Sequence, residues 1–306
     1  MKDFFKLIRY QNLLMLALMQ FVIRYGFLKR LGIPLSLTHL QYALLVLSTV
    51  LIAAAGYVIN DVFDQQTDAK NKPLKVIVGK TISEAKAYNI YAILNISGVA
   101  IGFYLSNVIE KPGFAAVFIV IAATLYLYAN SLKQMMIVGN VIVALLLGFS
   151  VIIIAVFDLF PATYPGNQQQ MANAFSVLLD YAIFAFLINL IREMVKDLED
   201  VEGDHNQGMH TLPIALGVAR TSKVVFGLSI FPILILLFYI NKYYFASNLY
   251  LATIYAFVFV VAPLIYFSVK MWSAKSPKDF RHLSSVLKLV IFFGLLSIAV
   301  VTYDIL

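Results

Sequence analysis

Carboxylate side chains are concentrated in two short segments of this chain. The sequence has 16 acidic residues, and nine of them fall within residues 60–68 and 193–204. Each segment adjoins a long apolar run, and unpaired carboxylates beside a bilayer are costly to keep. Mg²⁺ prefers oxygen ligands of this kind and commonly shares its coordination shell with substrate phosphates. The two segments therefore indicate a site for Mg²⁺ and, through it, a diphosphate.

The spacing within each segment predicts a polar stripe along one helix face, because residues three or four apart share a face. In the first segment the stripe is Asn60, Asp64 and Asp68, if the helix continues past the membrane. In the second segment it is Asn189, Glu193, Asp197, Asp200 and Asp204, whereas Glu199 and Glu202 point elsewhere and are predicted to be solvated. We expect the metal ligands to be Asn60, Asp64, Asp68, Glu193, Asp197, Asp200 and Asp204. We expect the catalytic carboxylates to be Asp64, Asp68, Asp197 and Asp200.

The plain alternative is that both segments are hydrophilic loops, which are common in membrane proteins. One pair of carboxylates four residues apart would favour that alternative. Two stripes at helix exits, each followed by basic residues, favour a binding site. A calcium EF-hand is excluded, because the alternating ligands and central glycine of that loop are absent.

Basic and amide side chains near the two segments are candidates for binding phosphate oxygens. Lysine ammonium groups bind phosphate as point charges, although any one lysine can equally reflect membrane topology. Asn140 lies just inside an apolar run and is either a contact between helices or a site residue. The predicted substrate-binding residues are Asn60, Lys72, Lys75, Lys133, Asn140, Arg9, Asn12, Asn189 and Arg192. His205 and His210 lack metal-ligand spacing and are interpreted as loop histidines.

The composition belongs to a polytopic membrane protein. The mean hydropathy is +0.86, and 61% of residues are hydrophobic while 13% are charged. A bilayer core about 30 Å thick requires roughly 20 apolar residues for each helix. Nine such spans are predicted, at about 11–28, 40–59, 88–107, 113–130, 136–157, 174–192, 223–241, 247–269 and 284–303. We expect one all-α domain over residues 1–306, a bundle of nine transmembrane helices whose first helix is retained rather than cleaved.

The basic residues predict the orientation of these spans. Of the 23 lysines and arginines, 18 fall before the first span or in the connections on that same side. By the positive-inside rule, the N-terminus and both acidic segments are cytoplasmic and the C-terminus is outside the plasma membrane. The net charge of +7 is therefore a topology signal, and no nucleic-acid partner is expected. The chain has no cysteine, which excludes disulfides, thiolate metal sites and a cysteine nucleophile.

Taken together, these motifs resemble the UbiA superfamily of intramembrane prenyltransferases over essentially the whole chain. The resemblance is carried by the NDxxDxxxD sequence at 60–68, the second acidic motif at 193–204 and nine spans with both motifs on one side. Supporting stretches are 72–83, 131–140 and 208–217. The second motif is most similar to the digeranylgeranylglyceryl phosphate synthase branch. One departure is lysine at 72 and 75, where the family often has arginine, because lysine cannot grip phosphate bidentately.

The resemblance implies a Mg²⁺-dependent prenyl transfer. A polyprenyl diphosphate donor, such as geranylgeranyl diphosphate, would lose its diphosphate as an allylic carbocation forms. The acceptor would be the hydroxyl of a prenylglyceryl phosphate, which gives an ether lipid. The first alternative is an aromatic acceptor in quinone or haem biosynthesis. The second alternative is a transporter, although transport sites usually lie near the bilayer midplane. Membrane lipids are expected as surroundings, and no obligatory protein partner is evident.

Overall fold

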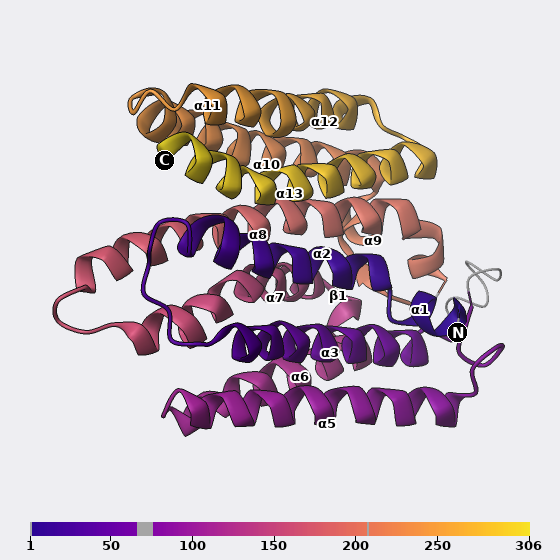
Figure 1. Cartoon of the computed structure of the whole chain (residues 1–306). Coiled ribbons are helices and arrows are strands. Elements are labelled where there is room, and N and C mark those ends of the chain that lie inside the picture. Colours follow the sequence, from indigo (N-terminus) through magenta and orange to yellow (C-terminus); the bar gives the residue numbers. More distant parts are fainter. Residues whose placement is uncertain (1, 66–75, 207) are drawn as a thin grey trace. The chain divides into compact units, whose positions relative to one another are not determined.

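The described part of the chain is almost entirely helical. Figure 1 shows the computed structural model, which describes residues 2–65, 76–206 and 208–306. Nine helical runs in these residues are long and apolar enough to cross a membrane. Each coincides with one of the nine predicted spans. All nine runs are longer than predicted, and the longest is Gln168–His205, with 38 residues.

Contacts between Cα atoms divide the chain into two compact units. The first unit comprises Met1–Phe21, Pro34–Lys133 and Ile153–Phe175, and the second comprises Val22–Ile33, Gln134–Ile152 and Ser176–Leu306. The elements that lie wholly or mainly in the first unit are α1 (Lys2–Leu7), α2 (Tyr10–Phe21), α3 (His39–Phe63), α5 (Glu84–Val108), η2 (Pro112–Phe114), α6 (Ala115–Asn130), η3 (Leu132–Gln134), η4 (Ala155–Leu159) and η5 (Phe160–Ala162). Those of the second are η1 (Val22–Leu28), β1 (Met135–Met136), α7 (Val138–Ile154), α8 (Gln168–His205), β2 (His210–Thr211), α9 (Leu212–Leu216), α10 (Val218–Tyr239), η6 (Ile240–Phe245), α11 (Tyr250–Ala256), η7 (Phe257–Val261), α12 (Ala262–Ser273) and α13 (Pro277–Ile305).

In the first unit, α3 packs against α2, α5 and α6. A capping box between Thr38 and Gln41 starts α3. Its contact with α5 is close, because Gly98 has no side chain and the Ser48 hydroxyl donates a 2.7 Å hydrogen bond to the Gly98 carbonyl. A Cβ atom at Gly98 would lie 2.7 Å from the Ile52 side chain. Small residues at such contacts let membrane helices approach one another closely.

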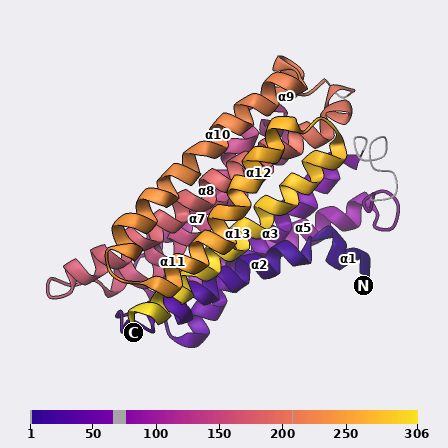
Figure 2. The same cartoon turned by 90° about the horizontal axis from the view of Figure 1, so that it is seen from above.

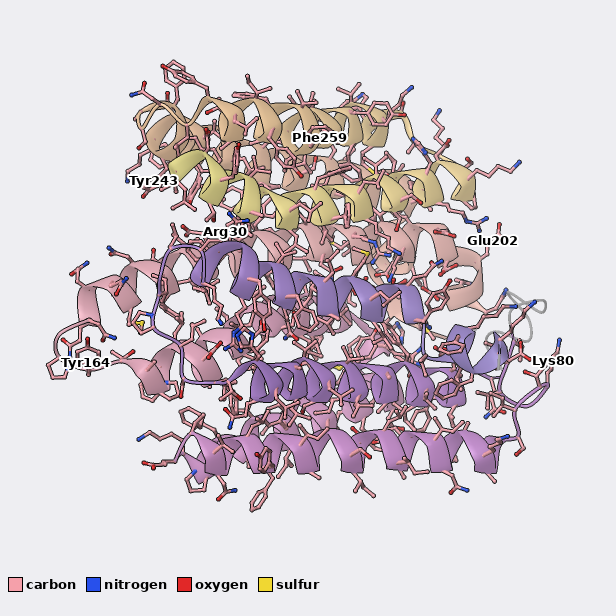
Figure 3. All side chains as sticks on the ribbon, viewed as in Figure 1. Arg30, Lys80, Tyr164, Glu202, Tyr243 and Phe259 are labelled. Carbon is pink, nitrogen blue, oxygen red and sulfur yellow. The ribbon has the colours of Figure 1, made fainter. Side chains whose placement is uncertain are left out.

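The C-terminal end of α3 is fixed by a hydrophobic cluster. Val58, Ile59 and Val62 of α3 are buried there together with Leu7 of α1 and Ala129 of α6. Residues of the loop before α5 complete the cluster. Figure 3 shows Lys80 at this end of the unit and Tyr164 at the opposite end. The cluster therefore fixes the start of the first acidic segment at one end of the packed helices of this unit.

In the second unit, α12 packs against both α10 and α13, and Figure 2 shows these helices side by side. One face of α8 contributes Ile188, Ile191, Val195 and Leu198 to the core, each at most 3% exposed. These residues recur every three or four positions, as expected for the apolar side of an amphipathic helix. The acidic stripe of α8 is consequently held on its other side.

The charged end of α8 remains helical as far as His205. Beyond it, β2 pairs in parallel with β1, with Met135 opposite His210 and Met136 opposite Thr211. A capping box between Ser276 and Asp279, with Pro277 in the first turn, starts α13. Figure 3 shows Glu202 at this end of the second unit, while Arg30 and Tyr243 lie toward the other.

Candidate active site

The first acidic segment begins in the last turn of α3. Asp64 is the residue that ends the helix, and its backbone N–H donates to the Asn60 carbonyl over 2.9 Å. The Asn60 side-chain amide donates to Oδ2 of Asp64 over 2.7 Å. The predicted spacing of four is therefore confirmed as a direct contact. Asn60 presents its nitrogen in this contact, whereas a metal ion would be bound by its side-chain oxygen.

Lys133 supplies a cation to the same carboxylate. Its Nζ atom lies 2.5 Å from Oδ1 of Asp64, and the two side chains are 10% and 16% exposed. Lys133 lies in η3, which directly follows α6 and Ser131. The structure thus brings a predicted phosphate-binding lysine onto a predicted catalytic carboxylate.

Arg9 and Asn12 contact the neighbouring turn of α3. The Arg9 guanidinium donates to Oδ1 of Asp61 over 3.0 Å and lies 4.9 Å from the centre of the Tyr57 ring. The Asn12 amide donates to the Tyr57 hydroxyl over 3.3 Å. Desolvation, the largest single cause, would lower the pKa of Arg9, but the charge of Asp61, its hydrogen bond to Arg9 and the nearby Tyr57 and Tyr128 together raise the pKa, so Arg9 stays charged. Asp61 belongs to the first motif, but its position one residue after Asn60 puts it off the stripe.

Arg9 adopts a left-handed backbone, with φ of 50°. This conformation is uncommon for a residue with a side chain. It forms the corner between α1 and α2, where the Arg9 carbonyl accepts from the backbone N–H of Asn12 over 2.8 Å. The contacts of the Arg9 side chain with Asp61 and Tyr57 hold this corner on the acid-bearing end of α3.

Three predicted site residues of the first segment lie outside the described residues. These are Asp68, Lys72 and Lys75.

The second acidic segment lies on α8, as its spacing predicts. The buried Asn140, in the first turn of α7, donates its side-chain amide to Oδ2 of Asp197 over 2.8 Å. Asn140 is 8% exposed, and Asn189, about two turns before Asp197 on the stripe, is 4% exposed. An amide that is buried and directed at a carboxylate fixes the orientation of that carboxylate.

Glu193 of this stripe is paired with two basic side chains. Lys196 donates to its two oxygens over 2.7 and 3.0 Å, and Arg192 donates to Oε1 over 3.3 Å. Asp200 and Asp204 follow on the same helix face, because α8 is continuous through both residues. Lys196 lies three residues after Glu193, so a helix through this motif would have predicted the contact between the two side chains.

The prediction that Glu199 is solvated is wrong. Its side chain is 14% exposed and accepts a 2.8 Å hydrogen bond from Nε of Arg281, in the first turns of α13. The helix period correctly excluded Glu199 from the stripe but gave no information about the neighbouring helix. Glu202, by contrast, is exposed as predicted.

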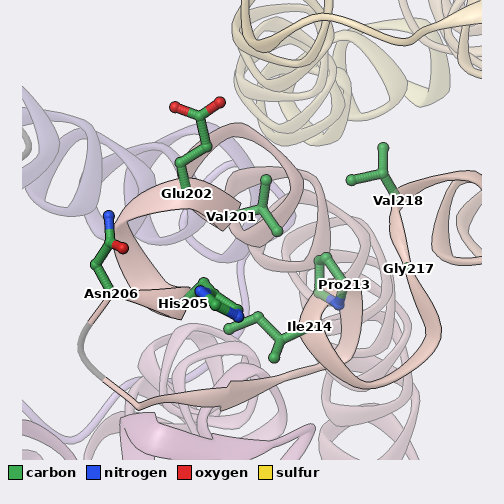
Figure 4. A pocket seen from close by; sticks show the side chains of 8 residues that line it. All are labelled: Val201, Glu202, His205, Asn206, Pro213, Ile214, Gly217 and Val218. Carbon is green, nitrogen blue, oxygen red and sulfur yellow. The ribbon is translucent and has the colours of Figure 1, made fainter.

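An open hollow of about 450 Å³ lies beside the end of α8 (Figure 4). Its lining includes Glu202, His205, Pro213 and Gly217. Glu202 lies five positions after Asp197, about 140° around the helix, whereas Val201, which also lines the hollow, lies four positions after Asp197 on the same helix face. The hollow therefore borders the acidic stripe, although its lining includes none of the acids of that stripe.

The protein ligands available here suit a cation whose coordination shell consists mostly of water and substrate oxygens. Among residues 2–65, 76–206 and 208–306, no three acidic or histidine side chains form a cluster close enough to hold a metal ion. Mg²⁺ usually keeps several waters and is bound by one or two carboxylates plus substrate phosphates. Asp64 at the end of α3 provides such a carboxylate in the first unit, and Asp197 on α8 provides one in the second. Each of the two therefore fits Mg²⁺ together with a phosphate ligand.

Comparison with known families agrees with this chemistry. The model of the UbiA prenyltransferase family matches residues 18–299. The chain belongs to the UbiA prenyltransferase family. It is therefore an integral membrane prenyltransferase, and the resemblance seen in the two acidic motifs is confirmed.

Two curated relatives show similarity over most of the chain. The digeranylgeranylglyceryl phosphate synthase of Korarchaeum cryptofilum is 32% identical over 262 residues, which are 80% of each chain. The enzyme of that name from Sulfurisphaera tokodaii is 31% identical over 227 residues, 73% of this chain and 74% of the relative.

Two solved structures share the fold. A digeranylgeranylglyceryl phosphate synthase structure has a TM-score of 0.63 at 23% identity and covers 98% of each chain. A UbiA homolog from Archaeoglobus fulgidus, solved with DMAPP and Mg²⁺ bound, has a TM-score of 0.59 at 15% identity. The latter match covers 97% of this chain and 99% of the homolog. The predicted all-α membrane fold is thereby confirmed.

Proposed function

We propose that this enzyme transfers a geranylgeranyl group from its diphosphate to the hydroxyl of geranylgeranylglyceryl phosphate, with Mg²⁺ as cofactor. The product is an ether lipid, digeranylgeranylglyceryl phosphate. The observation that carries the proposal is the 32% identity to a digeranylgeranylglyceryl phosphate synthase over 80% of the chain. The Mg²⁺ and DMAPP bound to a UbiA homolog of the same fold support the choice of cofactor and donor class.

The reaction exchanges one C–O bond for another. The bond between the allylic carbon and the diphosphate oxygen breaks, and its electron pair leaves with the diphosphate. The hydroxyl oxygen of the acceptor then bonds to that carbon and loses its proton. Charge develops on the leaving group as the first bond breaks, and fixed opposite charges at that point lower the barrier.

The proposed roles follow from the contacts on each segment. Bound Mg²⁺ would neutralise the diphosphate and stabilise it as a leaving group. Asp64 in the first unit and Asp197 in the second would each serve as a metal ligand, and the amides of Asn60 and Asn140 set the directions of these two carboxylates. Glu193, Asp200 and Asp204 would extend the negative surface on α8. Lys133, Arg9 and Arg192 would attract phosphate oxygens, as would Lys72 and Lys75.

The same proposal includes one domain and one orientation. The family match runs from residue 18 to 299, so we assign both compact units to a single prenyltransferase domain. The distribution of lysine and arginine supports a cytoplasmic N-terminus, a cytoplasmic site and an outside C-terminus. A water-soluble diphosphate head would then be delivered from the cytoplasm.

The function is tested by offering two acceptors to purified protein. Labelled geranylgeranyl diphosphate is supplied with Mg²⁺ and either geranylgeranylglyceryl phosphate or 4-hydroxybenzoate, and EDTA is added to matched samples. We expect label in the glyceryl lipid alone, and only with Mg²⁺. Label in the aromatic acid instead would assign the enzyme to quinone-type chemistry and overturn the proposed acceptor.

A further inference from the structure

Both oxygens of Asp64 are occupied by hydrogen-bond donors of this chain. Oδ1 accepts from the Lys133 ammonium over 2.5 Å, and Oδ2 accepts from the Asn60 amide over 2.7 Å. Each carboxylate oxygen has a second lone pair, so these two hydrogen bonds alone do not exclude a metal ion. A divalent cation that binds Asp64 while the Lys133 ammonium stays in place must, however, lie close to a full positive charge, which opposes its binding.

Of the two donors to Asp64, Lys133 is the one that carries a charge, so its departure leaves the carboxylate without a counter-ion. Asn60 is neutral and lies on the same helix turn as Asp64, so its amide can turn in place. Lys133 carries a full positive charge on a flexible four-carbon stem, which can swing while its backbone stays fixed. The Lys133 and Asp64 side chains are only 10% and 16% exposed, so water and salt screen this pair weakly.

Resting on the proposed function, we propose that Lys133 is an exchangeable counter-ion that makes the binding of metal and diphosphate mutually dependent. Without substrate, the ammonium neutralises Asp64 and competes with a divalent cation for it. When a diphosphate arrives with the cation, the displaced ammonium gains phosphate oxygens as its new partners. Lys133 thus opposes binding of the metal alone and favours binding of the metal together with diphosphate.

The second segment provides an internal contrast. Asp197 accepts a hydrogen bond from the neutral amide of Asn140. A metal ion that binds Asp197 therefore does not have to displace a positively charged group from this contact. The Lys196 ammonium on the same helix is close to Asp197 but donates its hydrogen bonds to Glu193, so the direct lysine contact that the exchange requires is the one at Asp64.

The proposal predicts shifts of opposite sign when the charge of Lys133 is removed. Mn²⁺ binding to purified protein is measured by electron paramagnetic resonance without any phosphate, and inorganic pyrophosphate binding is measured calorimetrically at saturating Mg²⁺. A charge this close shifts a competing equilibrium by about tenfold or more. In Lys133→Met we expect Mn²⁺ alone to bind about tenfold more tightly and pyrophosphate about tenfold more weakly.

Three further variants separate the charge from the side chain. Lys133→Gln keeps a hydrogen-bond donor without the charge and should behave like Lys133→Met. It replaces Lys133→Met in the test if Lys133→Met does not fold. Lys133→Arg keeps the charge and should bind Mn²⁺ as weakly as the wild type. Lys86→Met, at an exposed position in the first turn of α5, should change neither measurement.

The outcomes distinguish this inference from the proposed function. Tighter Mn²⁺ binding together with weaker pyrophosphate binding supports the exchange. If Mn²⁺ binding is unchanged or weaker in both Lys133→Met and Lys133→Gln, while the wild type binds Mn²⁺ and pyrophosphate, the exchange is overturned and the proposed function is not. If the wild type binds neither Mn²⁺ nor pyrophosphate, the proposed function fails and the exchange fails with it.

Discussion

Replacing Asn140 by leucine removes the donor that orients Asp197. The two side chains join over 2.8 Å, and Asn140 is only 8% exposed. A hydrogen bond to a charged group contributes about 1.5–3 kcal/mol. Since about 1.4 kcal/mol corresponds to a factor of ten, kcat/KM for prenyl transfer should fall by about 10- to 150-fold. The apparent affinity for Mg²⁺ should fall as well, because the carboxylate is no longer held in one direction.

The assay measures initial rates of label transfer in lipid vesicles at several Mg²⁺ concentrations. Asn140→Asp places a second negative charge beside Asp197 and should lose more activity than Asn140→Leu. Asn107→Leu is the matched control, because the Asn107 amide is exposed and donates to the Phe103 carbonyl of its own helix, α5. Transfer by Asn140→Leu within threefold of the wild type, at an unchanged Mg²⁺ dependence, would refute the orienting role.

Three other perturbations test separate parts of the structure. Arg281→Gln should reduce transfer no more than about fivefold, since the Arg281 side chain is 63% exposed and ion pairs near the surface contribute about 0–1 kcal/mol. Arg281→Glu should reduce transfer further, because it places two carboxylates together, and adding Glu199→Arg should restore the rate; a double variant worse than Arg281→Glu would contradict the pairing. Gly98→Val should lower the thermal unfolding temperature in detergent, because its Cβ would meet Ile52 at 2.7 Å and overpacking costs about 1–3 kcal/mol; Gly227→Ala, with open space around it, is the control. Single cysteines are informative in this cysteine-free chain: an impermeant maleimide should label Lys111→Cys in intact cells and Lys86→Cys only after permeabilisation, and the reverse pattern would invert the orientation.

The membrane spans could be predicted from the sequence because the bilayer imposes a length and an apolar composition on every helix. All nine predicted spans are helical in the described residues. Their ends were less predictable, since α8 continues through Arg192–His205 although these residues are charged. A helix can extend beyond the bilayer when its apolar side still packs on neighbours, as Val195 and Leu198 do.

The acidic stripes were predictable because they depend only on the helical period. That period placed Asp64 one turn after Asn60, and it placed Glu193 and Asp197 together on α8. It could not identify partners distant in the chain, and Lys133 is 69 residues from Asp64. For the same reason Arg281 was missed as the partner of Glu199, from which it is separated by 82 residues.

The central claim is that both acidic segments serve one Mg²⁺-dependent transfer. It is tested most directly by comparing Asp64→Asn and Asp197→Asn with Glu202→Gln, which alters an exposed acid on the same helix as Asp197. Each purified variant is given labelled geranylgeranyl diphosphate, geranylgeranylglyceryl phosphate and Mg²⁺. We expect Asp64→Asn and Asp197→Asn to lose transfer by at least about a hundredfold while remaining folded, and Glu202→Gln to match the wild type. Retained transfer in either aspartate variant would contradict the claim.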